Sequence, residues 1–221
     1  MTVIGITGPT GSGKTTALEA LARMGYEIVD CDALYYELLR TDRNLRQSLE
    51  EAFGPVFLPD GSLDRKSLSA RVFGDSRELR RLNAIVFPAV YASVEQKIKN
   101  CSQKGLAIDA INLVESGLAA LCALTVAITA DPALRLRRIM ARDGLDEKRA
   151  MARIAAQKPD SWYRDQCTFV LENRAGSRAE FQRLMENFFA GTDRTEKQGG
   201  KTSYGRESME EKNPRGEKER L

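Results

Sequence analysis

The chain has 221 residues, of which 42% are hydrophobic and 29% are charged, as expected for a globular domain with a full core. It contains no histidine, which excludes a histidine base, a histidine triad and a histidine-ligated metal site. The net charge of +3 is too small to indicate nucleic-acid binding, although it suits an anionic small molecule.

The first part of the chain predicts an α/β fold with parallel strands. Residues 2–7 form a β-branched run that is typical of a buried strand. The pattern becomes helical from Gly13 and stops at Gly25, and residues 26–29 then predict a second strand. Asp30-Cys31-Asp32 follows and opens another helix. Strand, loop, helix and strand in this order favour a parallel sheet.

A helical insertion is predicted at residues 44–104. Apolar residues recur there at helical spacing, and we expect Pro88 to begin a long helix that carries Val90, Val94 and Ile98. About fifty residues pass without a predicted strand, and insertions of this kind commonly carry substrate contacts.

The remaining strands alternate with helices. Residues 105–111, 124–129 and 167–171 predict the third, fourth and fifth strands. Between the last two, residues 131–165 predict a helix hairpin that begins at Asp131-Pro132, with Asp as the cap and Pro in the first turn. The pattern therefore predicts a five-stranded parallel sheet flanked by helices, within a core domain of residues 1–191.

The last residues differ in composition. Residues 192–221 include fifteen charged side chains, and their large apolar residues are Tyr204, Met209 and Leu221. Such a segment cannot bury enough apolar surface to offset its chain entropy. We therefore predict a disordered charged tail.

Residues 8–15 carry the strongest functional motif. They read Gly-Pro-Thr-Gly-Ser-Gly-Lys-Thr and match G-x-x-x-x-G-K-[ST] between a predicted strand and a predicted helix. The glycines let backbone N–H groups surround an anion, and the helix adds the positive end of its dipole. We predict a nucleoside triphosphate site in which Lys14 reaches the β- and γ-phosphates and Thr15 ligates Mg²⁺. The other phosphate contacts are expected from Gly11, Ser12 and Gly13.

Asp30 and Asp32 follow the second predicted strand, at the end where α/β sheets bind ligands. Their spacing leads us to expect that only one of them faces the site. Asp32 could accept a proton from a hydroxyl group that attacks the triphosphate. It is equally well placed to cap the following helix, and the spacing alone does not decide between base and cap.

Arg135, Arg138 and Arg142 share one side of a predicted helix at 100° per residue. They could stabilise charge on a transferring phosphoryl group, or they could form a solvated face. The hairpin that holds them resembles the lid of small-molecule kinases, which keeps both interpretations open.

The cysteines indicate the compartment. The four of them, at positions 31, 101, 122 and 167, are far apart and lack the spacing of a zinc site. A chain of this length does not need disulfides, so we expect reduced thiols in a cytoplasmic protein. The sequence shows no basic leader and no apolar run of membrane-span length, so we expect no membrane partner.

Taken in order, the motifs resemble those of the dephospho-coenzyme A kinase family over about residues 2–190. The phosphate loop is generic, but its combination with D-G-x-L-D-R is specific to that family. The matching segments are G-x-x-G-S-G-K-[ST]-T at 8–16, D-x-D at 30–32, A-F-G at 52–54, D-G-x-L-D-R at 60–65, V-F at 72–73, L-N-x-I-x-H-P at 82–88, P-L-L-[FV]-E at 111–115, R-x-x-x-R-D at 138–143, R-x-x-x-Q at 153–157 and D-x-x-[IL]-x-N ending at 173.

The resemblance implies a phosphate-loop kinase fold with a helical acceptor-binding insertion and a helical lid. It implies transfer of the ATP γ-phosphoryl group to the ribose 3′-hydroxyl of dephospho-coenzyme A, the last step of coenzyme A biosynthesis. By this resemblance Asp32 is the catalytic base and Arg65 contacts the acceptor. Arg142 and Asn173 are ATP contacts at the lid and the adenine, and Thr16 joins the phosphate loop.

The chain departs from the family pattern at three places. Phe87 replaces the usual histidine, Ile-Asn-Leu-Val precedes Glu115 in place of Pro-Leu-Leu-Phe, and the first Asp of the last-strand motif is absent. Two alternative functions are therefore kept. One is another phosphate-loop kinase for a nucleoside or small metabolite, and the other is a nucleotide-binding module that has lost phosphotransfer. The oligomeric state is not predicted.

Overall fold

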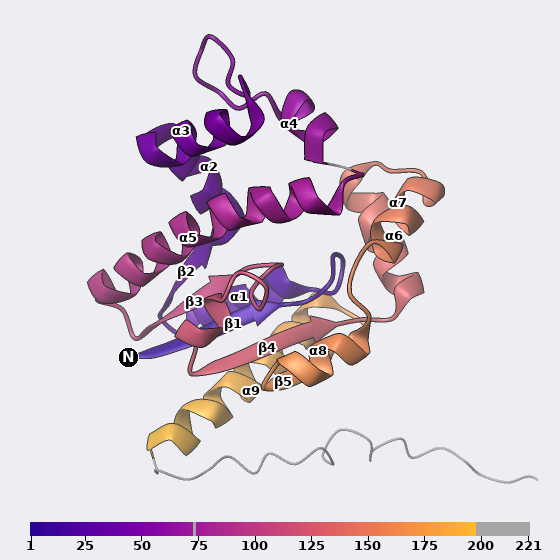
Figure 1. The fold of residues 1–221 in the computed structure, drawn as a ribbon. Coiled ribbons are helices and arrows are strands. Elements are labelled where there is room, and N and C mark those ends of the chain that lie inside the picture. Colours follow the sequence, from indigo (N-terminus) through magenta and orange to yellow (C-terminus); the bar gives the residue numbers. More distant parts are fainter. Residues whose placement is uncertain (73, 198–221) are drawn as a thin grey trace, which may run out of the picture. The chain divides into compact units, whose positions relative to one another are not determined.

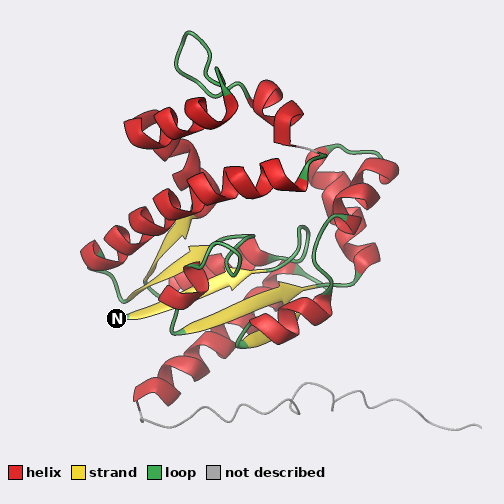
Figure 2. Cartoon of the chain, viewed as in Figure 1, coloured by secondary structure: helices red, strands yellow, loops and turns green. Residues whose placement is uncertain are grey.

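The computed structural model describes residues 1–72 and 74–197. Figure 1 shows one sheet with helices packed around it, and Figure 2 separates the strands from the helices by colour. The strand order is β2-β3-β1-β4-β5, and each neighbouring pair is parallel. The predicted five-stranded parallel sheet is confirmed. Its strands are β1 (Thr2–Thr7), β2 (Tyr26–Asp30), β3 (Gly105–Asp109), β4 (Leu124–Thr129) and β5 (Phe169–Glu172).

The register of the sheet brings the carboxyl ends of three strands to one edge. Asp109 of β3 lies opposite Ile6 of β1 and opposite Asp30 of β2. The loop after β1, the helix after β2 and the end of β3 therefore meet at this edge, where parallel sheets bind their ligands.

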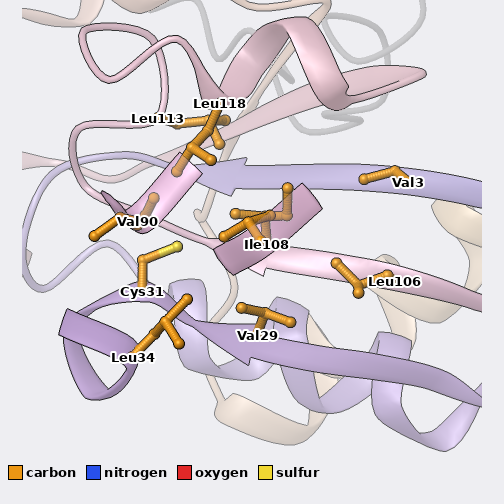
Figure 3. Packing of buried hydrophobic residues seen from close by; sticks show 11 residues of the cluster. Val3, Val29, Cys31, Leu34, Val90, Leu106, Ile108, Leu113 and Leu118 are labelled. Atoms are coloured by element: carbon orange, nitrogen blue, oxygen red, sulfur yellow. The ribbon is translucent and has the colours of Figure 1, made fainter. Parts of the chain in front are cut away.

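The core on one face of the sheet joins strands to two helices, α2 (Cys31–Thr41) and α5 (Ser76–Asn100). Figure 3 shows Val3, Leu106 and Ile108 of the strands together with Leu34 of α2 and Val90 of α5. These side chains are at most 6% exposed, so their burial removes most of their apolar surface from water. This packing fixes the start of α2 against the end of the sheet.

The insertion is helical, as predicted. It contains α3 (Arg43–Phe53), α4 (Arg65–Val72) and most of α5, and within its described residues the β-structure is one isolated bridge between Phe57 and Leu63. Figure 1 shows α3 and α4 on the side of α5 that faces away from the sheet. They share an apolar cluster with α2 and α5, whose buried members are Leu39, Leu45, Leu49, Phe53, Val56, Leu68 and Val72.

The prediction that Pro88 begins a helix is wrong. The helix α5 begins at Ser76, with Asp75 as its cap, and continues through Pro88 to Asn100. An interior proline costs a helix one backbone hydrogen bond and introduces a steric clash. Apolar residues on both sides of Pro88 are packed into the two clusters, and this burial holds the helix continuous. They are Leu82, Ile85 and Val86 before it, and Val90 and Val94 after it.

Three helices follow β4 in the segment predicted as the lid region: α6 (Pro132–Asp143), α7 (Glu147–Ala155) and α8 (Asp160–Gln166). The Asp131 side chain caps α6 by accepting hydrogen bonds from the N–H groups of Ala133 and Leu134, at 2.8 and 3.2 Å. Figure 1 shows α6 and α7 beyond the carboxyl ends of the strands. The strand β5 begins two residues later than predicted, because the Cys167 N–H group is bonded to the Tyr163 carbonyl at the end of α8.

The last helix, α9 (Arg178–Lys197), continues past residue 191, where we expected the tail to begin. No proline or glycine occurs at residues 192–197, so the local sequence has no strong signal to end the helix there. The rest of the predicted tail, residues 198–221, lies outside the described residues, as does Phe73 of the V-F motif.

The chain divides into two units, Met1–Glu186 and Asn187–Leu221. The first contains the sheet, the insertion and the lid. The described part of the second is the end of α9, where the Thr192 hydroxyl donates to the Phe189 carbonyl at 2.9 Å. Among the described helices, none has the length and apolar character needed to cross a membrane.

Candidate active site

The phosphate loop connects β1 to α1 (Lys14–Arg23) at the carboxyl edge of the sheet. Gly8 has φ of +129°, and a Cβ there would lie 2.1 Å from the Ile128 carbonyl oxygen. Gly13 has φ of +111°, and a Cβ there would lie 2.5 Å from Asn173 Nδ2. Only glycine fits either position. The Gly13 side of α1 carries no side-chain cap, which leaves the first-turn N–H groups for an anion.

Lys14 is folded against its own loop. Its Nζ donates to the Gly8 carbonyl at 2.7 Å and to the Pro9 carbonyl at 3.3 Å. Burial lowers the pKa of Lys14, and the nearby carboxylates of Asp109 and Asp32 oppose this change. The ammonium group is therefore poorly solvated, and an anionic phosphate at this position would stabilise it.

Asp30 and Asp32 have separate roles, which the spacing alone could not decide. Asp30 caps α2, since its Oδ1 accepts from the N–H groups of Asp32 and Ala33 at 2.9 and 3.0 Å. Asp32 lies in the first turn of that helix. Both Asp30 and Asp32 line the cleft, so the expectation that only one of them faces the site is wrong. Burial raises the pKa of Asp32, Asp30 raises it further, and Lys14 lowers it. A carboxylate with a raised pKa is a better proton acceptor than a solvated one.

Asp109 is a site residue that the sequence analysis did not select. Burial raises its pKa to about 6, in spite of Lys14, which lowers it. Asp30 and Asp32 raise it further. The signal was present in the sequence, because an apolar run, Gly105–Ile108, ends in an Asp at the carboxyl end of a strand.

These residues surround one cleft of about 970 Å³. Its floor is the phosphate loop with Lys14, Thr15 and Thr16, and its walls are the two strand ends and the lid. Of the residues predicted to act here, the structure brings together Gly11, Gly13, Lys14, Thr15, Thr16, Asp32, Arg142 and Asn173. Ser12, which was also predicted to contact the phosphates, is fully buried and does not line the cleft.

The three lid arginines differ in their contacts. Arg135 is 5% exposed and donates to the Thr10 carbonyl at 3.0 Å. Arg138 donates to the carbonyls of Gly11 and Ser12 at 3.1 and 3.3 Å. Arg142 is exposed in the cleft and makes a bidentate pair with Asp143, at 2.7 and 3.0 Å. Arg135 and Arg138 therefore hold the loop, and Arg138 and Arg142 line the cleft.

Asn173 follows β5 and is 3% exposed. Its Nδ2 donates to the Ser12 carbonyl at 2.9 Å, and its backbone N–H donates to the Thr129 carbonyl at 2.8 Å. This amide supports the back of the phosphate loop. A contact with adenine stays a prediction.

A second cavity, of about 200 Å³, adjoins the main cleft. Asp32 and Ile111 line both this cavity and the main cleft. Phe87 of α5 faces it, so the position of the family's histidine belongs to this cavity. Its other lining residues include Tyr35, Leu82, Asn83, Val86 and Asn112.

Arg65 is not brought into either space. It begins α4, and its guanidinium carbon lies 4.2 Å from the centre of the Tyr36 ring. Both residues line a third pocket of about 410 Å³ between α2 and the loop that contains Ser62. The predicted contact of Arg65 with the acceptor stays a prediction.

Mg²⁺ fits the donors at this edge. Among the described residues, no three His, Cys, Asp or Glu side chains gather to hold a metal. Magnesium does not need such a group, because it is usually bound by one or two carboxylates, waters and substrate phosphates. Thr15 offers a hydroxyl group in the cleft, and Asp32 and Asp109, whose pKa values are raised mainly by burial, offer carboxylates there.

Comparison with known proteins identifies the family. The profile of the family CoaE, dephospho-CoA kinase, matches residues 2–179 of this chain. The chain belongs to the dephospho-CoA kinase family. This finding confirms the predicted ATP-dependent phosphotransferase activity, dephospho-CoA kinase, which is the last step of coenzyme A biosynthesis.

Two relatives and one solved structure support this family assignment. The dephospho-CoA kinase of Geobacter sulfurreducens is 34% identical over 194 residues, which cover 86% of this chain and 98% of that protein. The dephospho-CoA kinase of Mycolicibacterium paratuberculosis is 41% identical over 179 residues, or 80% of this chain, but the match spans only 44% of that longer protein. A crystal structure of TT1252 from Thermus thermophilus is 32% identical, with a TM-score of 0.71 over 87% of this chain and 97% of that one. The phosphate-loop kinase fold is therefore confirmed.

Proposed function

We propose that Asp32 is the base when this chain transfers the γ-phosphoryl group of ATP to the ribose 3′-hydroxyl of dephospho-CoA. The observation that carries the proposal is that Asp32 lines both the main cleft beside Lys14 and the second cavity. A group at this position lies between a donor in the cleft and an acceptor in the cavity. Since Asp30 caps the helix, Asp32 is not needed as its cap.

The donor triphosphate is proposed to lie in the phosphate loop. Its β- and γ-phosphates displace the Gly8 and Pro9 carbonyls from Lys14, because an anion stabilises a buried ammonium better than a neutral carbonyl does. Arg142 is the exposed lid cation, and it exchanges Asp143 for the transferring phosphoryl group. Gly11, Gly13, Thr15 and Thr16 supply backbone N–H groups around the phosphates.

Mg²⁺ is proposed to bind beside Thr15, and Asp109 is proposed to supply the carboxylate that interacts with the ion. When bound, the ion neutralises charge on the β- and γ-phosphates. The protein residues orient this complex: Thr15 offers its hydroxyl group, and Asp109 remains ionised once positive charge is close to it.

The acceptor is proposed to reach Asp32 through the second cavity. The adenosine end of dephospho-CoA brings a flat base and a ribose, and the aromatic and apolar lining, with Tyr35 and Phe87, suits a base. Asp32 accepts the proton of the attacking hydroxyl group, which makes the oxygen a better nucleophile as the bond to phosphorus forms. Phe87 and Ile111 replace family residues here, so this cavity is where acceptor binding in this chain is expected to differ.

The cellular location and the partners of the protein are also proposed from this chemistry. We infer a cytoplasmic enzyme with ATP and dephospho-CoA as small-molecule partners, without nucleic acid or membrane. Both substrates are polyanions, and a chain of net charge +3 with cationic groups in its cleft suits them.

The test is a coupled assay of ADP release with dephospho-CoA, adenosine or shikimate as the acceptor. We expect turnover with dephospho-CoA to exceed the other two by about 10²-fold, because buried polar groups reject acceptors that leave them unpaired. Equal turnover with adenosine would favour a nucleoside kinase. ATP hydrolysis that does not depend on any acceptor would contradict the proposal.

A further inference from the structure

Thr10, in the phosphate loop, is held by two side chains from distant parts of the chain. Its N–H group donates to Gln157 Oε1 at 3.1 Å, and its hydroxyl oxygen accepts from Gln157 Nε2 at 2.8 Å. Its carbonyl accepts from Arg135 Nε at 3.0 Å. These contacts cross 147 and 125 positions of sequence, and they engage the backbone N–H, the carbonyl and the side chain of Thr10 together.

Gln157 and Arg135 are also bonded to each other. Arg135 Nη2 donates to Gln157 Oε1 at 2.5 Å, so this oxygen accepts from both Thr10 and Arg135. The guanidinium group is buried, and its partners at this point are neutral oxygens of Thr10 and Gln157. Removing the amide would leave a buried cation and a loop N–H without a partner, which is costly in a low-dielectric environment.

The position of Gln157 in the chain shows which segments these contacts join. It follows α7 directly after Ala156, where the lid hairpin returns to the body of the protein. The lid segment is therefore bonded to the same loop that surrounds the phosphates. Thr10 lies between Gly8 and Gly13, so this amide is bonded to the middle of the loop.

We infer that Gln157 is a positioning residue, which fixes the phosphate loop through Thr10 and Arg135 in the shape that binds ATP. It acts on the nucleotide and not on the acceptor, because its three hydrogen bonds go to Thr10 and Arg135, neither of which lines the second cavity. The inference rests on the proposed function only in that ATP is the ligand of this loop.

The test compares Gln157→Met with Gln157→Glu. Methionine keeps the length of the side chain and loses all three hydrogen bonds. Glutamate keeps an acceptor for the Thr10 N–H, for Arg135 and for the Thr10 hydroxyl proton. The matched control is Gln166→Met, at an exposed glutamine that ends α8. The measurements are the Kd of a fluorescent ATP analogue without acceptor, and kcat and KM for both substrates.

We expect Gln157→Met to raise the Kd and KM for ATP at least tenfold and to leave the KM for dephospho-CoA within twofold. Gln157→Glu should restore the ATP constants to within about threefold, and Gln166→Met should match wild type. Unchanged ATP constants in Gln157→Met, or failure of Gln157→Glu to restore them, would overturn the inference.

A second variant covers the case in which Gln157→Met does not fold. Thr10→Val removes only the bond from Gln157 Nε2, and it should raise the Kd for ATP about threefold without changing the KM for the acceptor. No change in that Kd would also overturn the inference. The binding measurement needs no acceptor, so it stays valid even if wild type fails to phosphorylate dephospho-CoA, which would refute the proposed function alone.

Discussion

Replacing Asp30 and Asp32 one at a time should separate stability from catalysis. Asp30→Ala removes a cap whose two hydrogen bonds measure 2.9 and 3.0 Å. Loss of such a cap costs about 1 kcal/mol, which corresponds to a Tm decrease of about 2–4 °C for a chain of this size. Asp32→Asn breaks no capping bond and removes a carboxylate whose pKa burial raises, so the free energy of unfolding should not fall. Its kcat should decrease by about 10²-fold or more.

The pH dependence of kcat/KM tests Asp30 and Asp32 in a second way. A base must be deprotonated, so kcat/KM should fall as the pH decreases through the pKa of Asp32. The carboxylate of Asp30 contributes to raising that pKa, after burial. Asp30→Ala should therefore move the acid limb of the profile to lower pH, while kcat above the limb stays within a few-fold of wild type.

Thermal unfolding together with steady-state kinetics across pH measures all of these quantities. If Asp32→Asn keeps the wild-type kcat and instead lowers Tm, Asp32 serves the helix and the reasoning is wrong. If Asp30→Ala leaves the acid limb unmoved, the titrating group is not the neighbour of Asp30.

Three further predictions concern neighbouring residues. Lys14→Ala should abolish measurable turnover with little change in Tm, because the described hydrogen bonds of Lys14 go to two loop carbonyls; comparable turnover in the mutant would refute the phosphate-loop assignment. Folding raises the pKa of Asp109 from 3.8 to about 6, so this group contributes stability below pH 4 that is lost as the pH rises through 6. That shift in pKa corresponds to at most about 3 kcal/mol of folding free energy. Because the side chain faces a solvated cleft, the effect should be smaller, and Asp109→Asn should stabilise the fold by about 1 kcal/mol at pH 7 in denaturant titrations. The gain should vanish near pH 4, and a gain equal at both pH values would contradict the assigned pKa. Phe87→His should change mainly the KM for dephospho-CoA, by a few-fold, because Phe87 lines the second cavity and not the main cleft. A change confined to the KM for ATP would refute the assignment of Phe87 to the acceptor site.

The parts of the site that the sequence predicts are those whose chemistry is local. The phosphate loop is one continuous segment in which glycine spacing, a lysine and a hydroxyl residue occur together between a strand and a helix. The strands are similarly local, since β1 and β4 have the bounds that their β-branched runs predict.

Contacts between distant residues could not be predicted in this way. In sequence Asp32 fits the role of base and the role of helix cap equally well, and the structure shows that Asp30 is the cap of α2. Arg135 and Arg138 are on the same helix face as Arg142, yet they contact a loop more than 120 positions earlier in the chain. Asp109 becomes a site residue because β3 is inserted between β1 and β2 in the sheet, and its strand position alone is common.

Pro88 shows a second reason why structure could not be predicted fully from the local sequence. A proline is a strong local signal for a helix start, but packing on both sides of it can outweigh one lost backbone bond. The energy that decides the outcome comes from side chains of α2, α3, α4 and the sheet, which the local pattern does not contain.

The most direct test of the account follows the phosphorus atom. Wild-type protein is incubated with ATP labelled at the γ-phosphate, Mg²⁺ and dephospho-CoA, and the labelled products are separated and identified. The account predicts that the label appears as a phosphate on the ribose 3′-oxygen of coenzyme A, and that Asp32→Asn slows its appearance by about 10²-fold. Label released as inorganic phosphate, or transferred at an equal rate by wild type and Asp32→Asn, would contradict it.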